Sequence, residues 1–519
     1  MTRRPHILWA DDEIELLRPH MLFLEEKGYD VTGVNSGLEA IEKVAESTFD
    51  LVFLDENMPG IHGIETLQRI KANHPDLPVI MITKSEEEHI MEEAIGSKIS
   101  DYLIKPVNPN QILLAVKKIL DNRRLQDEQA QSTYMREFRE LAMRLGGHME
   151  AAEWAEVYRR LMHWHVTLGE AGDRSMLEIL ETQHAEANHQ FARFVEAHYE
   201  AWMTGAEEAP MLSHRLLPEW LPPVLEGAGD RPVFLVVIDN LRWDQWRAIA
   251  PSLRQLWNVT EERTYFSMLP TATQYARNAL FAGMTPAEIE RVMPSCWIPE
   301  SAEGSKNAHE ETLQRALFDR MGIEGRTSYH KITNLGAGKR LVDRFHEVKG
   351  QRICTIVYNF VDMLSHARSD MEVIKELADD EAAYRSLTQS WFVHSPLKEM
   401  MDAMAEMGGR MILTTDHGTM RVDQPVEVRG DRETNNNLRY KVGKNLGYDR
   451  DAVMPVRHPE RVGLPKPNVS SSYIFAKNRD FLVYPNNHAK YVKTFRDTFQ
   501  HGGISLEEMI IPWVVLDPK

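Results

Sequence analysis

The chain has 519 residues, and its composition is that of a folded protein with several domains. At about 150 residues per domain, this length predicts three or four domains. Charged residues make up 27% of the sequence and hydrophobic residues 43%, which excludes a disordered or collagen-like chain. The formal net charge of −18 disfavours binding to duplex DNA or to anionic lipid. Two distant cysteines, Cys296 and Cys354, exclude a disulfide framework and a zinc–thiolate knuckle.

The sequence contains no apolar stretch of the length that a membrane-spanning helix needs. The apolar run near the N-terminus ends at Asp11-Asp12-Glu13, which is too early for a signal peptide. We therefore expect a cytoplasmic protein with no membrane segment.

Residues 1–121 are predicted to form a first α/β domain. Short apolar runs at 7–10, 51–54 and 79–82 are typical of strands, and segments with an apolar period near 3.6 separate them. Strands that alternate with helices in this way predict a doubly wound parallel sheet with helices on both faces.

Chemically active residues follow the predicted strands of this domain. Residues just past the carboxyl ends of parallel strands meet at one crevice. Three carboxylates at one crevice repel one another, so a divalent cation is the natural neutraliser, and oxygen ligands favour Mg²⁺. A carboxylate beside Mg²⁺ is a nucleophile towards phosphorus. The alternative is that these residues are ordinary loop residues without a chemical role. That alternative does not account for five such positions in order: Asp11-Asp12, Asp55, Thr83 and Lys105-Pro106.

This set resembles the flavodoxin-like receiver domain of two-component response regulators over residues 4–121. The resemblance rests on the acids and the Lys-Pro pair above and on the run Asp55-Glu56-Asn57-Met58-Pro59-Gly60. It implies that a sensor histidine kinase phosphorylates Asp55. It further implies Mg²⁺ ligands at Asp11 and Asp12, phosphoryl contacts at Thr83 and Lys105, and a switch aromatic at Tyr102.

Residues 122–205 contain no proline and no strand-like run, which predicts an all-α helical bundle. Two Glu-x-x-His sequences, ending at His184 and His189, match the spacing of di-iron sites in helical bundles. They lie on one predicted helix and point in different directions, so one metal cannot use both. Solvated helix faces are the better interpretation.

From residue 206 to 519, alternating strands and helices predict a second and larger α/β domain. Apolar strands are expected at 233–238, 353–361 and 411–413. Five segments of this domain place a metal-capable residue or a hydroxyl beside a predicted strand or helix end: Asp239, Thr271 to Thr273, Asp362 with His366, Asp416-His417, and His501. Together they supply three Asp and three His, which suffices for two Zn²⁺ sites with coordination left open for a substrate.

In this order the set resembles the alkaline phosphatase superfamily, and specifically its PglZ-like branch, over about residues 206–519. The motifs that carry the resemblance are VVIDNLRWD, LPTATQ, NFVDMLSH, TTDHG and HGGISLEEMIIP. The resemblance implies one zinc held by Asp239, Asp416, His417 and the Thr271 hydroxyl, and a second held by Asp362, His366 and His501. Thr271 is preferred over Thr273 as the nucleophile because the nucleophile of the superfamily follows the proline.

The substrate contacts are less well defined by the sequence. The Pro-Asn pair of related phosphodiesterases is missing after Thr271, which leaves Asn278 as the candidate phosphate contact. A polar-basic run supplies further candidates, Asn436, Arg439 and Lys441, which could attract an anionic substrate. A solvated charged loop is an equally good interpretation of this run.

The order of receiver, helical bundle and PglZ-like domain resembles the PorX-like response regulators of type IX protein secretion. This resemblance implies a zinc phosphodiesterase that acts on nucleotide or oligonucleotide phosphodiesters and is controlled by phosphorylation of Asp55. A sigma factor or secretion component is then the implied partner, and we expect a homodimer on phosphorylation. The alternative is a non-catalytic adaptor whose enzyme-like fold binds a partner.

Overall fold

The structure is a computed structural model that divides into two compact units, Met1–Tyr134 and Met135–Lys519. It describes residues 4–84, 99–171, 174–359, 361, 380–431, 434–486 and 488–519, with the side chains of 121–132, 170 and 171 left out. The predicted division into 1–121, 122–205 and 206–519 stays a prediction.

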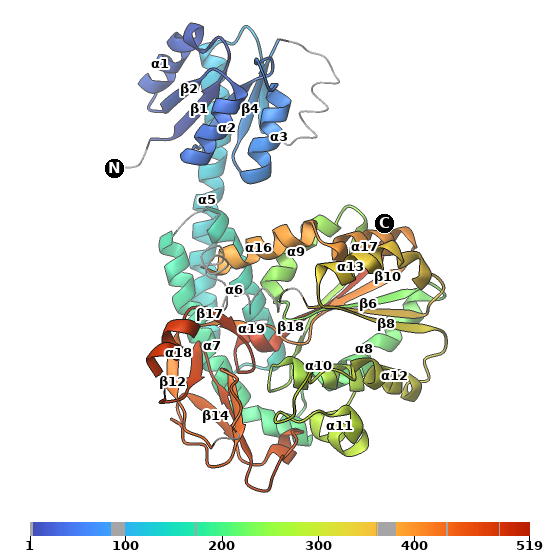
Figure 1. Ribbon diagram of the computed structural model, residues 1–519. Coiled ribbons are helices and arrows are strands. Elements are labelled where there is room, and N and C mark those ends of the chain that lie inside the picture. The colour runs from blue at the N-terminus through green and yellow to red at the C-terminus, as the bar shows by residue number, and fades with distance from the viewer. Residues whose placement is uncertain are drawn as a thin grey trace. The chain divides into compact units, whose positions relative to one another are not determined.

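A five-stranded parallel sheet forms the centre of the first unit (Figure 1). Its strand order, β2-β1-β3-β4-β5, is that of flavodoxin-like doubly wound folds, as predicted. The strands are β1 (His6–Ala10), β2 (Asp30–Val34), β3 (Leu51–Asp55), β4 (Val79–Thr83) and β5 (Asp101–Ile104). The helical segments are η1 (Ile14–Leu17), α1 (Arg18–Glu26), α2 (Gly37–Glu46), α3 (Gly63–Asn73) and the start of α5 (Pro109–Leu145).

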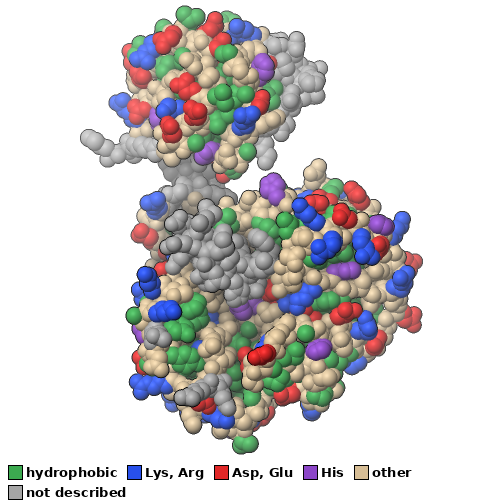
Figure 2. Space-filling view, viewed as in Figure 1, with side chains coloured by type: hydrophobic (Ala, Val, Ile, Leu, Met, Phe, Trp, Pro, Cys, Tyr) green, Lys and Arg blue, Asp and Glu red, His purple; other side chains and the backbone are tan. Residues whose placement is uncertain are grey.

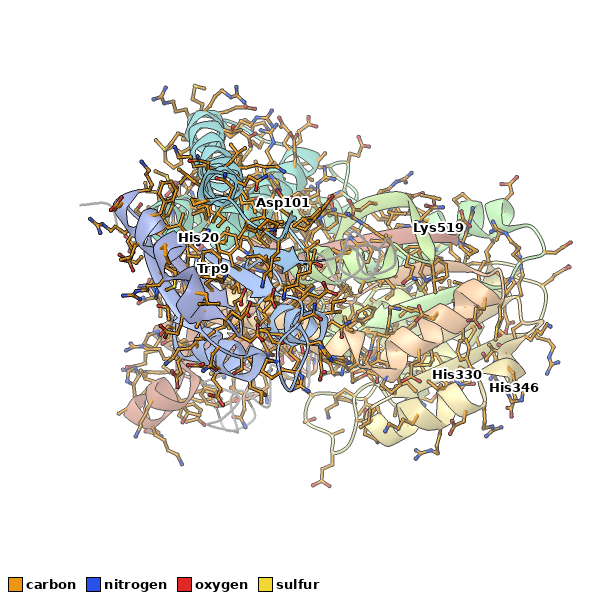
Figure 3. All side chains as sticks on the ribbon, turned by 90° about the horizontal axis from the view of Figure 1, so that it is seen from above. Trp9, His20, Asp101, His330, His346 and Lys519 are labelled. Atoms are coloured by element: carbon orange, nitrogen blue, oxygen red, sulfur yellow. The ribbon has the colours of Figure 1, made fainter. Side chains whose placement is uncertain are left out.

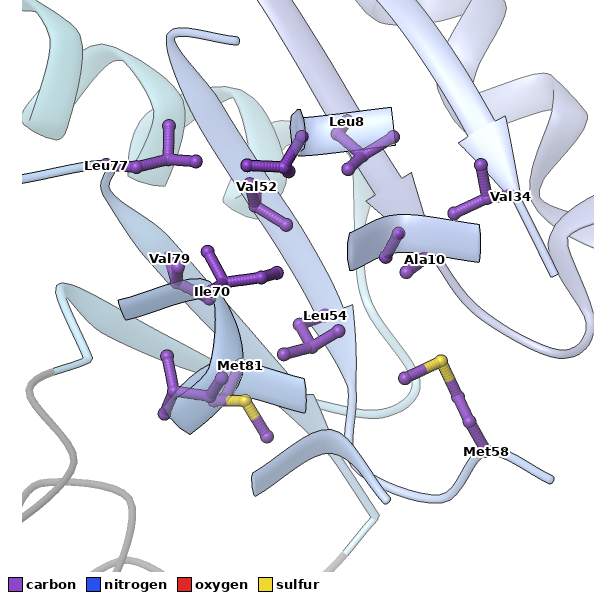
Figure 4. Packing of buried hydrophobic residues seen from close by; sticks show 13 residues of the cluster. Leu8, Ala10, Val34, Val52, Leu54, Met58, Ile70, Leu77, Val79 and Met81 are labelled. Atoms are coloured by element: carbon purple, nitrogen blue, oxygen red, sulfur yellow. The ribbon is translucent and has the colours of Figure 1, made fainter. Parts of the chain in front are cut away.

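The strands of this sheet are apolar at nearly every position because both faces are covered. Leu8, Val52 and Leu54 belong to one buried cluster (Figure 4). Trp9 and Phe53, whose ring centroids lie 4.8 Å apart, belong to the cluster on the other face. Trp9 also meets the ring of His20 from α1 (Figure 3). Alternation of side chains along a strand thus divides one apolar run between two cores.

The second unit begins with long helices, α6 (Ala151–Ala171) and α7 (Arg174–Thr204), which follow the end of α5. Their apolar faces bury Trp154, Leu161 and Phe191. The interpretation of the Glu-x-x-His sequences as solvated faces is wrong for His184, whose side chain is 14% exposed. Its Nε2 lies 2.9 Å from Oε1 of Glu507, a residue 323 positions along the chain that no helical pattern reveals.

A six-stranded mixed sheet in the order β7-β18-β10-β6-β9-β8 forms the centre of the rest of this unit (Figure 1). The four neighbouring strands β10, β6, β9 and β8 are parallel to one another. β18 is antiparallel to both of its neighbours, β10 and β7. The strands are β6 (Val233–Ile238), β7 (Trp257–Phe266), β8 (Thr327–Ile332), β9 (Ile353–Tyr358), β10 (Arg410–Thr414) and β18 (Ile510–Pro518). The sequence pattern predicted β6, β9 and β10 and missed the other three, of which β7 and β8 carry many polar residues.

Three small sheets and several helices complete the unit. The small sheets pair β11 (Met420–Val422) with β17 (Thr498–Gln500), β12 (Gln424–Glu427) with β16 (Asp480–Val483), and β15 (Ser472–Ala476) with β13 (Tyr440–Gly443) and β14 (Val453–Val456). The helices are α8 (Ser213–Ala228), α9 (Trp243–Leu253), α10 (Thr273–Ala282), α11 (Pro286–Val292), η2 (Pro294–Cys296), α12 (Glu310–Arg320), α13 (Leu335–Asp343), η3 (Phe345–Val348), α16 (Glu381–Val393), α17 (Pro396–Glu406), η4 (Pro459–Val462), α18 (His488–Phe495) and α19 (Leu506–Met509).

Acidic and basic side chains are interspersed over the face of the molecule in Figure 2. No helix in the described part of the chain is long and apolar enough to cross a membrane.

Two histidines, the buried His165 and the partly buried His214, predict that acid destabilises the second unit. Burial lowers the pKa of His165 to about 3 and that of His214 to about 4. Both pKa values lie below the unfolded value of about 6.5, so the unfolded chain takes up protons first as the pH falls. The free energy of unfolding should therefore decrease by about 1 kcal/mol per pH unit for each histidine, from about pH 6.5 down to about pH 4.

Urea unfolding at several pH values measures this effect. His214→Leu should make the unfolding midpoint less sensitive to pH in this window, whereas His394→Leu, at an exposed position, should not. Equal pH dependence of the wild type and the His214→Leu variant would contradict the prediction.

Candidate active site and metal centre

The predicted acids of the first unit meet at the carboxyl ends of β1 and β3. Asp11 and Asp55 are buried and Asp12 is exposed, and one carboxylate oxygen of each lies within 4.8 Å of the others. The Lys105 Nζ atom lies 2.8 Å from Asp11 Oδ2 and 2.6 Å from Asp55 Oδ1. Four of the five predicted positions are therefore brought to one crevice. The Lys105–Pro106 bond is cis.

Charge balance at this crevice is set by burial and by Lys105. Burial raises the pKa of Asp55, and the hydrogen bond from Lys105 opposes that effect. Burial alone would lower the pKa of Lys105, but the hydrogen bonds to Asp11 and Asp55 outweigh it and raise that pKa. Three carboxylates thus face one ammonium group, which is the electrostatic setting that favours a bound divalent cation.

The remaining receiver residues lie near the neighbouring strand ends. Thr83, at the end of β4, is buried and its hydroxyl donates to Glu56 Oε2. Tyr102 in β5 is 41% exposed. A phosphoryl group on Asp55 would compete with Glu56 for the Thr83 hydroxyl, since both are anionic acceptors.

In the second unit, the neighbouring parallel strands β6 and β10 deliver the predicted acids. Asp239 follows β6, and Asp416 and His417 follow β10. All three are fully buried, and one ligand atom of each lies within 4.8 Å of the others. The His417 Nε2 atom is 3.8 Å from Asp239 Oδ1 and 3.6 Å from Asp416 Oδ2. The structure therefore brings three of the seven predicted metal ligands together.

The imidazole of His417 is oriented as metal-bound histidines are. Its Nδ1 lies 3.0 Å from the carbonyl oxygen of Gly418, so Nδ1–H donates there and the lone pair of Nε2 faces the two carboxylates. A side chain on Gly418 would collide with the carbonyl oxygen of Glu507, which explains the glycine of the TTDHG motif. The donor set, two carboxylates and one imidazole, suits Zn²⁺.

The loop after β6 is held in an unusual conformation. Asn240 has a φ of +66°, a left-handed value that asparagine adopts more readily than most residues. The next amide, of Leu241, donates to Thr415 Oγ1 at 3.0 Å, which ties this loop to the loop after β10. The buried pair of Arg242 and Asp244 then begins α9, with Arg242 Nε donating to Asp244 Oδ1 at 2.9 Å. These contacts fix the position of Asp239 relative to Asp416.

The two candidate nucleophiles, Thr271 and Thr273, face different surroundings. The Thr271 hydroxyl donates to Gly503 O at 2.8 Å and accepts from Gly502 N at 3.0 Å. The Thr273 hydroxyl lies 3.0 Å from His417 Nε2 and 3.5 Å from Asp239 Oδ1. The geometry thus puts the Thr273 hydroxyl at the cluster. The assignment of Thr271 as nucleophile and metal ligand stays a prediction.

A buried arginine that the sequence analysis did not single out lies against the cluster. The Arg277 Nη1 atom is 2.6 Å from Asp239 Oδ2, and its Nε is 2.6 Å from Glu310 Oε1. Glu310 also pairs with Lys331 Nζ at 2.9 Å. Burial alone would lower the pKa of Arg277, but Asp239, Glu310 and Asp416 together raise it. Arg277 thus stays charged and offsets part of the negative charge of the two aspartates.

Of the three residues predicted to hold the second zinc, only His501 lies in the described part of the chain. Its ring stacks on that of His417, with centroids 4.3 Å apart and planes at 17°. Its Nδ1 lies 3.2 Å from the carbonyl oxygen of Thr271. Asp362 and His366 lie outside the described residues, so the second zinc site stays a prediction.

Two of the four predicted substrate-binding side chains form hydrogen bonds to other residues of the protein. Arg439 is fully buried, and its Nε and Nη2 donate to Glu508 at 3.1 and 2.6 Å. Asn278 is also buried: its Nδ2 donates to Lys306 O at 3.2 Å and its Oδ1 accepts from Asn307 at 3.0 Å. Both side chains therefore have structural partners, and their assignment as substrate contacts stays a prediction.

The other two substrate candidates differ in exposure. Asn436 is exposed. Lys441 is buried, its Nζ donates to Asn435 O at 3.2 Å and lies 4.4 Å from the ring centre of Tyr484, and burial lowers its pKa to about 7. These two stay predictions.

Three known families match successive parts of the chain. Residues 7–117 match the response regulator receiver domain, and 124–203 match the PorX response regulator linker domain. Residues 216–516, more than half of the chain, match the BREX system PglZ alkaline phosphatase-like domain. The chain belongs to the PglZ alkaline phosphatase-like family. The order of the three matches is that of a PorX-like response regulator, as the sequence predicted.

Two curated relatives match shorter stretches of the chain. The transcriptional regulatory protein ZraR of Klebsiella oxytoca is 37% identical over 132 residues, which cover 25% of this chain and 30% of that protein. ResD of Bacillus subtilis is 35% identical over 119 residues, covering 23% of this chain and 49% of that protein. The chain thus spans less than half of either relative.

A solved structure matches a stretch of similar length. The CheY-like receiver domain protein of Methanospirillum hungatei JF-1 has 28% identity, a TM-score of 0.23, and coverage of 23% of this chain and 96% of that one. A receiver domain takes its phosphoryl group from a donor such as a histidine kinase.

Proposed function

We propose that the chain is a response regulator whose effector is a zinc-dependent phosphodiesterase acting on nucleotide or oligonucleotide phosphodiesters. The observation that carries the proposal is the buried group of Asp239, Asp416 and His417, with the Thr273 hydroxyl 3.0 Å from His417 Nε2. Two carboxylates, an imidazole and an adjacent hydroxyl are the parts that a metal-assisted phosphoryl transfer requires.

Asp239, Asp416 and His417 would hold one Zn²⁺, and Asp362, His366 and His501 would hold the second. When bound, zinc makes a hydroxyl more acidic and stabilises negative charge on phosphoryl oxygens. Thr273 Oγ forms the new bond to phosphorus as the bond to the leaving alcohol breaks. Water then cleaves the phosphothreonine ester and restores the Thr273 hydroxyl.

Metal analysis together with an aryl phosphodiester assay tests this function. Asp416→Asn should reduce bound zinc and lower hydrolysis of bis(p-nitrophenyl) phosphate by more than about a hundredfold, because it removes a metal ligand. Asp449→Asn, at an exposed position, is the matched control and should change neither. Less than one zinc per chain in the wild type, with hydrolysis that persists in EDTA, would exclude the proposal.

One observation favours the alternative of a non-catalytic adaptor. Arg277 already compensates part of the charge of Asp239 at 2.6 Å, so the cluster has one cation even without a metal. In an adaptor, Arg277 would be the permanent partner of the acids, and added zinc would leave the thermal stability unchanged. In a metalloenzyme, zinc should raise the unfolding temperature of the wild type and not that of Asp416→Asn.

We further propose that phosphorylation of Asp55 controls this effector and that the output serves type IX secretion through a sigma factor or secretion component. Support comes from the acid crevice and from the match of 124–203 to the PorX linker domain. A phosphoryl group on Asp55 adds negative charge that Mg²⁺ and Lys105 would balance.

Phosphorylation should also change the assembly state. BeF₃⁻ with Mg²⁺ should convert the wild type from monomer to a two-fold homodimer, the commonest oligomer symmetry, and should leave Asp55→Ala monomeric. Light scattering of both proteins with and without BeF₃⁻ measures this. Equal masses in all four samples would mean that the receiver signals by another route.

A further inference from the structure

One edge of the six-stranded sheet leaves strand backbone open. β7 is the edge strand. It pairs with β18, and among the described residues its other side has one bridge, between Phe266 and Leu212. The Phe266 amide donates to Met211 O at 2.8 Å and so points away from β18. Alternate residues of a strand direct their backbone groups to the same side, so the amides and carbonyls of Thr264 and Glu262 point away from β18 as well.

The opposing strand supports this assignment. Thr264 is opposite Pro512, which has no amide hydrogen to donate. The Pro512 carbonyl accepts from Thr414 Oγ1 at 2.8 Å, on the β10 side of β18. In the described part of the chain, no backbone group pairs with Glu262 or Thr264 on the open side.

A groove of about 700 Å³ runs along this edge. Aromatic side chains from α7, α8 and β7 line it, and Trp202 contacts Phe194 and Phe266 at centroid distances of 5.3 and 6.1 Å. The start of α6 and the segment 207–211 also contribute to the lining. Apolar side chains of a bound segment would therefore find aromatic contacts beside the open backbone.

The charges of the groove favour a basic occupant. Glu150 and Glu208 are exposed, and among the described residues neither forms an ion pair with Lys or Arg. The two arginines of the lining are directed onto indole rings: the guanidinium of Arg159 lies 5.8 Å from the Trp243 ring centre, and that of Arg263 lies 5.3 Å from the Trp220 ring centre. The charge left at the groove is negative.

We propose that this groove is a docking site for an extended segment of a partner protein. The segment would add to the open edge of β7 through backbone hydrogen bonds, place an apolar or aromatic side chain on the Phe194–Trp202 surface, and direct a Lys or Arg at Glu150 or Glu208. The site is separate from the metal cluster, so it goes beyond the proposed phosphodiesterase.

Selection of random dodecapeptides displayed on phage against the full-length protein tests the proposal. Enriched peptides should carry Lys or Arg beside an apolar residue. Their affinity should fall at least about fivefold for Thr264→Pro, which removes an outward amide, and should be kept by Thr264→Val, which retains it. Proline is tolerated at an edge position of this kind, and a thermal unfolding curve checks that the variant is folded.

Two further measurements separate backbone docking from other binding. Glu150→Lys/Glu208→Lys should weaken the selected peptides by about tenfold, whereas Glu406→Lys, outside the groove, should not. N-methylation of alternate peptide amides should abolish binding even if Thr264→Pro does not fold. No enrichment over an unrelated protein, enrichment of acidic peptides, or binding that survives N-methylation would each overturn the proposal.

Discussion

Replacing Thr273 by alanine should lower phosphodiester hydrolysis by about a thousandfold or more while zinc stays bound. The hydroxyl removed is the one at 3.0 Å from His417 Nε2, whereas Asp239, Asp416 and His417 are unchanged. Thr273→Ser keeps a hydroxyl at the same position and should retain much of the activity. Steady-state hydrolysis of an aryl phosphodiester, with zinc content measured on the same samples, gives both quantities.

Thr271→Ala is the matched comparison and should act on stability more than on chemistry. Its hydroxyl bridges Gly503 O and Gly502 N, and loss of a buried bridge costs about 1–3 kcal/mol. We expect a lower unfolding temperature and a much smaller loss of rate than for Thr273→Ala. A larger rate loss for Thr271→Ala, at equal zinc content, would show that Thr271 is the nucleophile after all.

Replacing Arg439 by methionine should destabilise the second unit by about 3–5 kcal/mol, because it leaves the carboxylate of Glu508 buried and unpaired. Both side chains are 0% exposed, and their closest atoms are 2.6 Å apart. Glu508 Oε1 also accepts from Gly503 N at 2.9 Å, so the loss should extend to the loop at Gly502 and Gly503 that contacts Thr271. The urea unfolding midpoint of the full chain measures the change.

Two variants show whether the charge pair is the cause. Arg429→Met removes an exposed arginine that lies 3.2 Å from Glu427, and it should cost less than about 1 kcal/mol. Arg439→Met/Glu508→Gln should be less destabilised than the sum of its single variants, since no unpaired charge remains. If Arg439→Met is as stable as Arg429→Met, the buried pair does not stabilise the fold.

Three of the five receiver strands, β1, β3 and β4, could be located from the sequence because their signals are local, whereas the ranges of β2 and β5 were not predicted. Each of these strands contains a continuous apolar run, and the chemical residues lie at a strand end: Asp55 and Thr83 are the last residues of β3 and β4, and Asp11 follows β1. Parallel strands in a doubly wound sheet then bring Asp11, Asp55 and Lys105 together without any further information. The same rule brought Asp239 and Asp416 together, since β6 and β10 are neighbouring parallel strands.

Side chains whose roles depend on distant partners could not be predicted. Arg439 belongs to a basic run in the sequence, but its partner Glu508 lies 69 positions away, so the run could not be distinguished from a substrate site. His184 was assigned to a solvated helix face for the same reason, because Glu507 covers it only in the folded unit.

The sequence by itself determined which residue types are available and which strand end carries each, because apolar periodicity and position along the chain encode both. Only the tertiary structure decided which hydroxyl lies beside His417. Thr271 lies just before α10, and Thr273 is its first residue. The loop at Gly502 and Gly503 binds the Thr271 hydroxyl, whereas the Thr273 hydroxyl faces His417. That choice depends on a contact across more than 230 positions, which no local pattern records.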